Sequence, residues 1–507
     1  MNGKVYLIGA GPGDPALITR RGAECIRQAD VVVYDYLASP RLLELRRPEA
    51  EVIYVGKKGG DHTLSQDGIN RLIADQARKG RVVARLKGGD PFIFGRGGEE
   101  AEVLAAEGIP FEIVPGVTSA IAAPAYAGIP LTHREHTSAV SLITGHEDPA
   151  KTESSLNWPA LAGLGGTLVF LMGVRNLPAI VERLTTHGLS GETPVALVRW
   201  GTTPRQQTVT GTLNTIVEEV SRAGLKAPCI IVIGEVVRLR ETISWFETRP
   251  LFGRTIVVTR ARPQASGFLE RLAAAGADCL ACPTIRVVPA EDPAPMDACL
   301  DRLSDYDWLV FTSVNGVACF FDRLFARGQD ARALGRLKTA VIGPATQQRL
   351  RDFGITSDIV PESYRAEAVV AAFARETVKG QKVLLPRAAE ARPVLPEELR
   401  RLGAAVDEVP AYYTVQDTSA VAELRDALAA GRVDLVTFTS SSTVKNFKAL
   451  LPDDPQERQH LLQGVQMASI GPITTATAEE EGFTVDITAD TYTIEGLTEA
   501  IIAHFAG

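Results

Sequence analysis

The sequence is poor in cysteine, in long apolar runs and in excess positive charge. Its six cysteines in 507 residues are scattered, which indicates a reducing compartment rather than a disulfide framework. No apolar run reaches the roughly 18 residues that a membrane helix needs. The first residues lead straight into a strand-like stretch, without room for a signal peptide. We therefore expect a cytoplasmic protein without a membrane association.

The net charge of −8 excludes a general affinity for nucleic acid. An acidic substrate would therefore need a local basic pocket. Cys279 and Cys282 form one C-x-x-C pair, which supplies half of the ligands of a structural zinc. No second pair or histidine lies nearby, so we expect strand packing there and no metal in the protein.

Length and patterning predict an α/β protein of two or three domains. A chain of 507 residues is too long for one ordinary core. Short apolar strands alternate with amphipathic helices throughout. A charged stretch at 238–254 is broken by Pro250 and Gly253, and a new strand follows it at once. We predict domains at 1–242 and 252–507, joined by a linker at 243–251.

The second half contains an internal repeat. TIVVTR at 255 returns as KVLLPR at 382, and DWLVFTS at 307 returns as DLVTFTS at 434, both with an offset of 127. AVIGPAT at 340 returns as ASIGPIT at 468, with an offset of 128. A nearly constant offset predicts two similar α/β lobes. Two such lobes usually bind a ligand in the cleft between them.

The loop GAGPGD (9–14) after the first strand has two interpretations. It resembles a dinucleotide-binding loop with Asp35 as the ribose acid, which would indicate a dehydrogenase. However, the third glycine comes one residue early and Pro12 interrupts the turn. A tight strand-to-helix turn accounts for the loop equally well, and the glycine spacing argues against a nicotinamide enzyme.

Two further loops favour a ligand site. In RLKGGDPFIFGRGGEE (85–100), Gly88-Gly89 lets the backbone approach a ligand closely, and Asp90 can accept hydrogen bonds from hydroxyl or amino groups. A merely flexible surface loop would leave its aromatic residues exposed without a purpose. In 114–136, small residues suit a helix start that admits a ligand, and histidine and arginine add positive charge.

Together these motifs resemble uroporphyrinogen-III C-methyltransferase, a member of the precorrin methyltransferase family, over about 3–242. TGH (144–146), FLMG (170–173) and RWGTTPRQ (199–206) extend the resemblance. It implies a two-lobed tetrapyrrole methyltransferase fold, a homodimer, and S-adenosylmethionine as the methyl donor with S-adenosylhomocysteine as product. Ser119 stands where many members have alanine. The positions that match cofactor contacts are Pro12, Gly88, Gly89, Asp90, Ile93, Thr118, Ser119, Met172 and Gly201.

The same resemblance implies the catalytic and substrate-binding residues. Asp35 and Lys57 match the positions assigned as general base and general acid, while Arg85 is a rival for the base or orienting role. Because uroporphyrinogen is octa-anionic, a basic pocket is expected. Its candidate members are Lys57, Lys58, Arg85, Lys87, Arg96, His133 and Arg134.

The second half shows no nucleophile motif or phosphate loop. Instead, Thr-Ser recurs after one strand at 312–313 and 439–440, and Gly-Pro-x-Thr recurs after another at 343–346 and 471–474. Hydroxyls and backbone N–H groups at strand ends suit carboxylate binding. Helix capping explains each of them about as well.

This half resembles uroporphyrinogen-III synthase across about 252–505, with FTSVNGV (311–317) and IGPAT (342–346) among its motifs. The resemblance implies a two-lobed α/β fold, with one lobe at about 252–287 plus 413–507 and the other at about 288–412. The implied reaction is dehydrative cyclisation of hydroxymethylbilane with inversion of the last ring, in which positioning dominates and Tyr412 assists hydroxyl departure. A module that only binds tetrapyrrole is the alternative. The candidate cleft residues are Thr346, Tyr412 and Thr474, with Ser313 and Ser440 on adjoining loops.

The two resemblances support each other, because the product of the second half is the substrate of the first. The expected partners are therefore small tetrapyrroles, hydroxymethylbilane and uroporphyrinogen III. The sequence leaves open whether the methylated product, precorrin-2, feeds siroheme or cobalamin, and whether the halves channel it.

Overall fold

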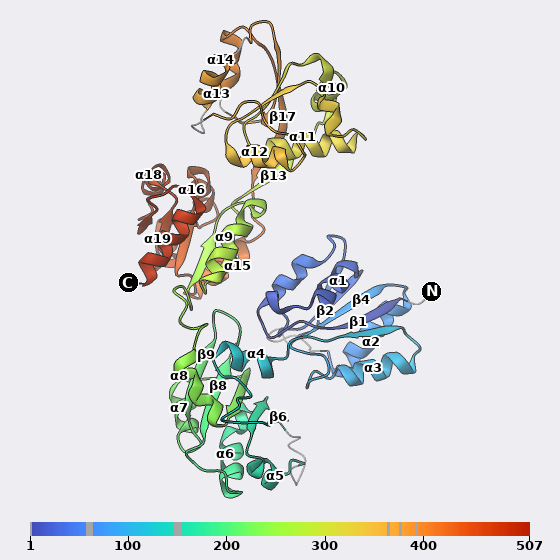
Figure 1. Cartoon of the computed structure of the whole chain (residues 1–507), viewed down its shortest axis with the longest axis vertical. Coiled ribbons are helices and arrows are strands. Elements are labelled where there is room, and N and C mark those ends of the chain that lie inside the picture. The colour runs from blue at the N-terminus through green and yellow to red at the C-terminus, as the bar shows by residue number, and fades with distance from the viewer. Residues whose placement is uncertain are drawn as a thin grey trace. The chain divides into compact units, whose positions relative to one another are not determined.

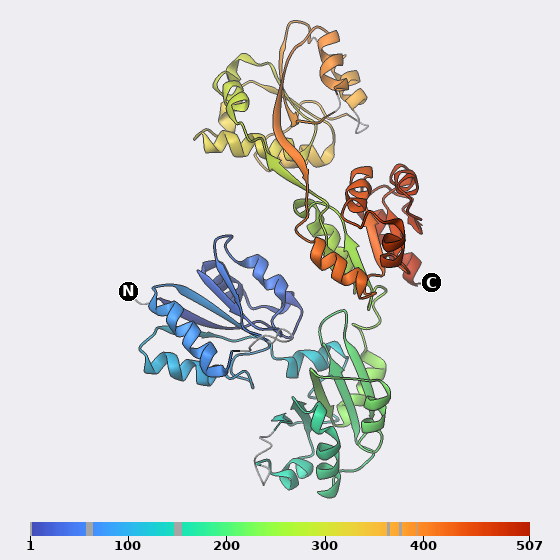
Figure 2. The ribbon, with the colours of Figure 1, turned by 180° about the vertical axis from the view of Figure 1, so that it is seen from behind.

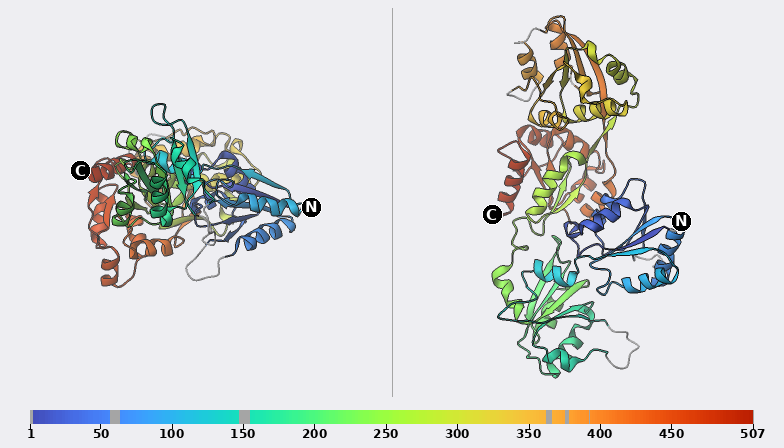
Figure 3. Two further views of the ribbon diagram at one scale, coloured as in Figure 1. Left: turned by 90° about the horizontal axis from the view of Figure 1, so that it is seen from below. Right: turned by 45° about the vertical axis from the view of Figure 1, so that its right-hand side comes forward.

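The computed structural model describes residues 3–56, 64–146, 155–361, 366–374, 378–391 and 393–506. The chain divides into two compact units, one built mainly from residues 1–255 and the other mainly from 256–270 and 279–501 (Figure 1). Four five-stranded sheets flanked by helices make up the described chain, which confirms the α/β prediction (Figure 3). None of the described helices combines the length and apolarity that crossing a bilayer requires.

The first sheet of the first unit is entirely parallel. Val5 and Leu7 belong to the apolar cluster on one face, and Tyr6 and Ile8 to the cluster on the other, so the strands are covered on both sides. Parallel strands end at a common edge, and the loops after β1, β2 and β4 therefore emerge together. The strand order is β3 (Glu51–Tyr54), β2 (Val31–Tyr34), β4 (Val82–Lys87), β1 (Lys4–Gly9) and β5 (Phe111–Val114), with helices α1 (Arg20–Gln28), α2 (Gln66–Arg78) and α3 (Gly97–Ala106).

The second sheet of this unit is mixed: β6 and β7 are parallel, and the remaining neighbours are antiparallel. Helix α4 (Ser119–Tyr126) packs Ala120 and Ala123 against Val169 and Val198 of this sheet. The strand order is β6 (Val140–Thr144), β7 (Thr167–Leu171), β10 (Cys229–Ile233), β8 (Pro194–Arg199) and β9 (Gln207–Thr212), with helices α5 (Trp158–Gly163), α6 (Leu177–Thr186) and α7 (Ile216–Arg222).

The predicted linker at 243–251 is not a free spacer in the structure. After helix α8 (Arg240–Ile243), the indole N–H of Trp245 donates to the carbonyl of Ala125 at 3.0 Å. Phe246 is buried with its ring 4.8 Å from that of Tyr126. The Glu247 carboxylate accepts from Gln206 at 2.7 Å. Apolar residues interleaved in a charged stretch thus hold this segment against the first unit.

The second unit contains two sheets. In one, β11 (Thr255–Val258) pairs in parallel with β18 (Leu435–Phe438), so segments far apart in sequence lie side by side. In the other, β17 (Ala405–Gln416) pairs antiparallel with β13 (Ile285–Pro289) and parallel with β16 (Lys382–Ala388); it is the long orange strand of Figure 2. The remaining strands are β12 (Asp278–Ala281), β19 (Gln466–Ser469), β20 (Ile487–Thr488), β14 (Trp308–Phe311) and β15 (Lys338–Val341).

The helices of this unit follow the strands in alternation. They are α9 (Arg262–Ala274), α10 (Ala294–Asp301), α11 (Val314–Ala326), α12 (Pro344–Arg351), α13 (Ala366–Phe373), α14 (Val394–Arg401), α15 (Val421–Ala429), α16 (Ser441–Lys448), α17 (Pro455–Leu461), α18 (Pro472–Glu480) and α19 (Ile494–Ala506).

The sequence repeat is divided between these two sheets. By the offsets of 127 and 128, β11 corresponds to β16, β18 to β14, and β19 to β15. The sheets run β12-β11-β18-β19-β20 and β13-β17-β16-β14-β15, so corresponding strands occupy the same order. Each copy of the repeat therefore contributes strands to both sheets, because β11 pairs with β18 and β16 pairs with β14.

The C-x-x-C pair is used for packing. Cys279 lies in β12, and Cys282 packs in a buried cluster with Val257 and Phe438. Burial raises the pKa of the Cys282 thiol to about 12. A buried thiol of that kind stays protonated near neutral pH and is a poor nucleophile.

Candidate functional site

Three glycine loops meet at the carboxyl edge of the parallel sheet. A Cβ on Gly9 would lie 2.4 Å from Cα of Gly116, and a Cβ on Gly116 would lie 2.4 Å from the carbonyl oxygen of Gly89. Gly11 and Gly89 exchange backbone hydrogen bonds of 2.7 and 3.2 Å. The loops after β1, β4 and β5 therefore touch backbone to backbone, in a space where side chains do not fit.

The Gly88-Gly89-Asp90 turn is fixed by this contact. Gly89 has a φ of +70°, and a Cβ on Gly88 would lie 2.5 Å from Cβ of Leu37. Asp90 accepts from the amide of Phe92 at 2.8 Å and from that of Gly116 at 2.9 Å. Asp90 thus holds two of the loops together, with one further lone pair on each oxygen.

Helix α4 begins beside these loops. Thr118 is its N-cap, and the Thr118 hydroxyl accepts from the amide of Ala120 at 3.3 Å. A Cβ on Gly89 would lie 3.6 Å from the Ser119 nitrogen. A Cβ on Gly201 would lie 2.4 Å from Cβ of Ala123, so the loop after β8 packs directly on this helix.

The loop after β1 also contacts the loop after β8. The amide of Asp14 donates to the Thr202 hydroxyl at 3.0 Å, and the Tyr126 hydroxyl donates to the Asp14 carboxylate at 3.2 Å. Burial and the Asp14 charge raise the pKa of Tyr126 to about 12. Of the predicted cofactor contacts, the structure thus brings together Gly88, Gly89, Asp90, Thr118, Ser119 and Gly201, and Pro12 lies between Gly11 and Gly13 in the loop after β1.

Strained backbone conformations occur in the loops after β4, β7 and β8. Within the described residues, the non-glycine residues with positive φ all lie in the first unit. Such conformations typically persist at ligand sites. Met172 follows Leu171, which packs with Ala120 of α4, and Met172 is 53 % exposed. Ile93 is 36 % exposed. The strained residues are Phe94, Arg96, Met172, Trp200 and Thr202.

Asp35 lies at the same edge, directly after β2, in front of a buried group of charges. Its two carboxylate oxygens accept from the amide of Leu37 and from Nη2 of Arg85, each at 3.1 Å. Arg85 is 3 % exposed and donates from Nη1 to the carbonyl of Leu86 at 2.7 Å. Behind it, Nζ of Lys87 donates to Oε1 of the fully buried Glu100 at 2.6 Å. Arg85 and Lys87 therefore lie inside the lobe and not on a basic surface.

The other predicted charges differ in position. Lys57 and Lys58 lie outside the described residues. Arg96 is exposed at the N-cap of α3 and forms a 3.3 Å ion pair with Glu99. The Arg96 side chain can thus exchange its weak surface ion pair with Glu99 for a contact with a ligand.

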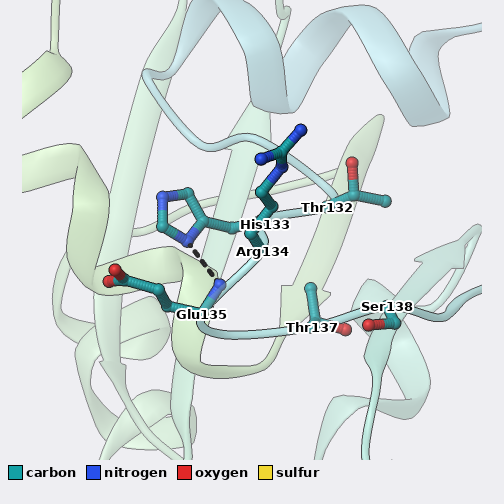
Figure 4. A pocket seen from close by; sticks show the side chains of 6 residues that line it. All are labelled: Thr132, His133, Arg134, Glu135, Thr137 and Ser138. Carbon is teal, nitrogen blue, oxygen red and sulfur yellow. Dashed lines mark hydrogen bonds between the residues drawn. The ribbon is translucent and has the colours of Figure 1, made fainter.

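His133 and Arg134 line a surface pocket with Thr132, Glu135, Thr137 and Ser138 (Figure 4). Nδ1 of His133 accepts from the amide of Glu135 at 3.2 Å. Ligand atoms of His133, Glu135 and His136 lie within 4.8 Å of one another. Three side chains with potential metal-ligating atoms thus lie close together in this turn, beside Arg134.

Four predicted residues of the second unit lie where strands pass into helices, namely Ser313, Thr346, Ser440 and Thr474, whereas Tyr412 lies within β17. The Ser313 and Tyr412 hydroxyls are 3.0 Å apart and form a hydrogen bond. Ser313 caps α11, and Ser440 caps α16 with a capping box to Thr443. Thr346 in α12 and Thr474 in α18 are 4 % and 5 % exposed. The matched loops of the repeat thus adopt the same strand-to-cap geometry in both sheets.

Two parts of the first site were missed from the sequence. Glu100, the shared partner of Arg85 and Lys87, was read as the end of a glycine loop; its signal is its place in the first turn of α3, where carboxylates are favoured. Thr202 and Gln206 fix the loop after β8, since the Gln206 side chain accepts from the amide of Thr202 at 2.9 Å. The spacing of residues in the sequence does not predict this hydrogen bond.

Comparisons with known proteins match the two parts of the chain to two different protein families. The sequence profile of the Tetrapyrrole (Corrin/Porphyrin) Methylases matches residues 4–217, and that of Uroporphyrinogen-III synthase HemD matches residues 266–499. The porphyrin biosynthesis protein HemD of Ruminiclostridium josui is 40 % identical over 458 residues, which is 90 % of each chain. The uroporphyrinogen-III C-methyltransferase of Bacillus subtilis is 41 % identical over 379 residues, covering 75 % of this chain and 77 % of the relative.

A crystal structure of uroporphyrin-III C-methyl transferase from Thermus thermophilus with S-adenosyl homocysteine is 38 % identical, and it covers 47 % of this chain and 100 % of its own, with a TM-score of 0.41. The two profiles and the relative matched over 90 % of its length account for both units of the chain. The chain therefore belongs to the family in which a tetrapyrrole methylase of the uroporphyrinogen-III C-methyltransferase type is fused to a uroporphyrinogen-III synthase.

Proposed function

We propose that the first unit transfers two methyl groups from S-adenosylmethionine to uroporphyrinogen III, giving precorrin-2 and S-adenosylhomocysteine. The observation that carries this proposal is the cradle of touching glycines at the edge of the parallel sheet, formed by Gly9, Gly11, Gly89 and Gly116. Asp35 lies at the same edge, where its carboxylate accepts from the amide of Leu37. In each transfer the sulfur–methyl bond breaks, a carbon–carbon bond forms on the tetrapyrrole, and the tetrapyrrole loses a proton.

The residues present fit the methyl donor. Gly9, Gly89 and Gly116 let the loops after β1, β4 and β5 meet backbone to backbone, and Asp90 in these loops keeps acceptor capacity for the polar groups of a nucleoside. The exposed side chains of Ile93 and Met172 offer apolar contact, and strained loops such as that at Met172 are typical of ligand sites. The bound donor supplies the electrophilic methyl group.

We assign the proton-accepting role to Asp35 and the orienting role to Arg85. An arginine guanidinium has no acceptor and stays protonated, so it cannot take a proton from the substrate. Arg85 donates to Asp35, to Leu86 and, more weakly at 3.4 Å, to Glu100. It therefore holds the carboxylate in place, while the side chain of Asp35 remains 26 % exposed to a substrate.

We propose that Arg96, His133 and Arg134, with Lys57 and Lys58, bind the substrate carboxylates. Arg96 and the pocket of Figure 4 are accessible, and Arg96 has only a surface ion pair to exchange. Such groups meet acidic side chains of a ligand by charge-assisted hydrogen bonds.

We propose that the second unit cyclises hydroxymethylbilane to uroporphyrinogen III with inversion of the last ring and loss of water. Hydroxyls at matched strand ends, Ser313 and Ser440, and the buried Tyr412 support a site that shapes the substrate. Tyr412 supplies a hydrogen bond to the departing hydroxyl. The alternative, a unit that only binds tetrapyrrole, is favoured by one observation: these hydroxyls already cap helices or bond each other.

We further propose a homodimer formed through the first unit, a cytoplasmic location, and delivery of precorrin-2 to siroheme or cobalamin synthesis. Sedimentation of the full chain tests the dimer. A monomer at concentrations that support full activity would contradict it.

The test of the two activities supplies each substrate separately to the purified chain. Uroporphyrinogen III with methyl-labelled S-adenosylmethionine should give doubly methylated product, and hydroxymethylbilane alone should give the III isomer. Uncatalysed cyclisation gives the I isomer, so product of that isomer alone would support the binding-only alternative. Absence of label in the tetrapyrrole would contradict the methyltransferase.

A further inference from the structure

Glu100 is the least exposed member of the charged group behind Asp35. Its carboxylate is 0 % exposed, and Oε1 accepts from Nζ of Lys87 at 2.6 Å, from Nε2 of Gln66 at 3.1 Å and from Nε of Arg85 at 3.4 Å. Oε2 is buried without a hydrogen-bond partner among the described residues. A buried carboxylate with one oxygen unpaired carries a desolvation cost, so its retention calls for a reason.

The charges of this group balance only when Glu100 is counted. Arg85 and Lys87 are 3 % and 4 % exposed, and they project from the same face of β4 at alternate positions. Asp35 and Glu100 supply the two opposing negative charges. Burial, followed by the neighbouring Arg85 charge, lowers the pKa of Lys87.

The distances divide the four groups into pairs. Lys87 lies 2.6 Å from Glu100, whereas Arg85 reaches Asp35 at 3.1 Å and Glu100 only at 3.4 Å. Glu100 is thus mainly the partner of Lys87, and Asp35 is left to Arg85. Without Glu100, two buried cations would share one carboxylate, the one that faces the substrate.

We propose that Glu100 is a positioning residue for methyl transfer: by neutralising Lys87 it leaves Arg85 alone to hold Asp35 at its catalytic place. This inference rests on the proposed methyltransferase activity. It assigns Glu100 no contact with the substrate or the methyl donor, because it lies wholly inside the lobe.

The test is a charge rescue in the full chain. Glu100→Gln keeps the shape of the side chain and leaves the group with an excess of one positive charge. We expect kcat for methylation of uroporphyrinogen III to fall by between about 10- and 100-fold, the range that misplacing a catalytic group produces. KM for uroporphyrinogen III and the Kd for S-adenosylhomocysteine should stay within about twofold, because the proposal gives Glu100 no contact with either ligand.

Glu100→Gln should also lower the melting temperature. Adding Lys87→Met to Glu100→Gln removes the excess positive charge, and it should restore most of kcat and most of the melting temperature. The matched control is Glu102→Gln on the exposed face of the same helix α3, which should match the parental chain. A purely structural role predicts that Glu100→Gln lowers the melting temperature while the folded protein keeps the parental kcat.

The outcomes separate the two proposals. An active parental chain in which Glu100→Gln folds and keeps the parental kcat would overturn the inference alone. A double variant no more active than the single one would do the same. A parental chain that transfers no methyl group at all would overturn the proposed function and this inference together.

Discussion

The candidate sites of the two units differ in the chemical groups that form them. The site of the first unit rests on touching glycine loops, positive-φ residues such as Met172 and Trp200, and the buried charges Arg85, Lys87 and Glu100 behind the partly exposed Asp35. The site of the second unit is made of hydroxyls that also cap helices or pair with each other, such as Ser313 with Tyr412.

This difference matches the two proposed reactions. Methyl transfer needs a donor held close to the backbone and a base at a fixed place, and strain and buried charge supply such fixed positions. Cyclisation of a chain that already carries its leaving group needs mainly a shaped surface. Substitutions should therefore change chemistry sharply in the first unit and more gently in the second.

The largest effect is expected at Asp35. Asp35→Asn removes the proton acceptor while keeping the shape of the side chain, and kcat for methylation should fall by about 10²- to 10⁴-fold, the typical contribution of general acid–base catalysis. The Kd for S-adenosylhomocysteine and the cyclisation rate should be unchanged. Both activities are measured on one preparation, and normal turnover would contradict the base assignment.

A smaller but still large effect is expected where the glycine loops touch. The methyl group of Gly116→Ala would lie 2.4 Å from the carbonyl oxygen of Gly89, so the backbone must shift. We expect the Kd for S-adenosylhomocysteine to rise at least about tenfold, in keeping with the cost of overpacking. Gly163→Ala, which has open space around the added carbon, is the matched control. Equal affinities by calorimetry would argue against the cradle.

A moderate effect is expected at Tyr412. Tyr412→Phe removes the hydrogen bond to Ser313 and should lower the free energy of unfolding by about 1 kcal/mol. The proposed role adds a loss of III-isomer formation of up to about tenfold, in the range of one hydrogen bond. Tyr413→Phe, on the adjacent and 39 % exposed side chain, is the control. Formation of the III isomer at the parental rate would leave Tyr412 a structural role only.

The smallest effect is expected for the ion pairs of Glu112 on the surface of the first unit. This prediction compares an exposed charge with the buried charges around Arg85. Hydrogen bonds from Arg21 and Lys4 lower the pKa of Glu112 to about 2 from its ordinary value of 4.5. A depressed carboxyl pKa contributes stability above about pH 4.5, and this contribution is lost as the pH falls towards 2.

The melting temperature of Glu112→Gln should therefore fall less between pH 5 and pH 2 than that of the parental chain. The difference should correspond to less than about 1 kcal/mol of unfolding free energy, because the carboxylate is partly exposed. The same scan on Glu102→Gln, which carries an exposed carboxylate on α3, is the reference. Identical pH profiles for Glu112→Gln and the parental chain would show that the pair contributes nothing.

The sequence predicted the α/β class and the family, because glycine loops, strand runs and an internal repeat are local patterns. The repeat also predicted that matched loops such as those at Ser313 and Ser440 would be alike, since equal sequences form equal caps. Asp35 became a candidate because it matches the position assigned as general base in the family that the first half resembles.

Other features depend on contacts between distant segments. The burial of Lys87 was not predicted, because its partner Glu100 lies 13 residues away on helix α3. The docking of Trp245 and Phe246 was also missed, since a stretch rich in charge indicates a spacer unless its few apolar residues find a surface. The spacing of residues in the sequence does not predict such tertiary contacts between distant segments.

The most direct measurement gives the purified full chain hydroxymethylbilane and methyl-labelled S-adenosylmethionine in one reaction and follows the label into tetrapyrrole. Our account predicts labelled precorrin-2 derived from the III isomer, because the second unit makes the substrate of the first. Label that enters tetrapyrrole only when uroporphyrinogen III is supplied would contradict the account, since it would leave the second unit without its cyclising activity.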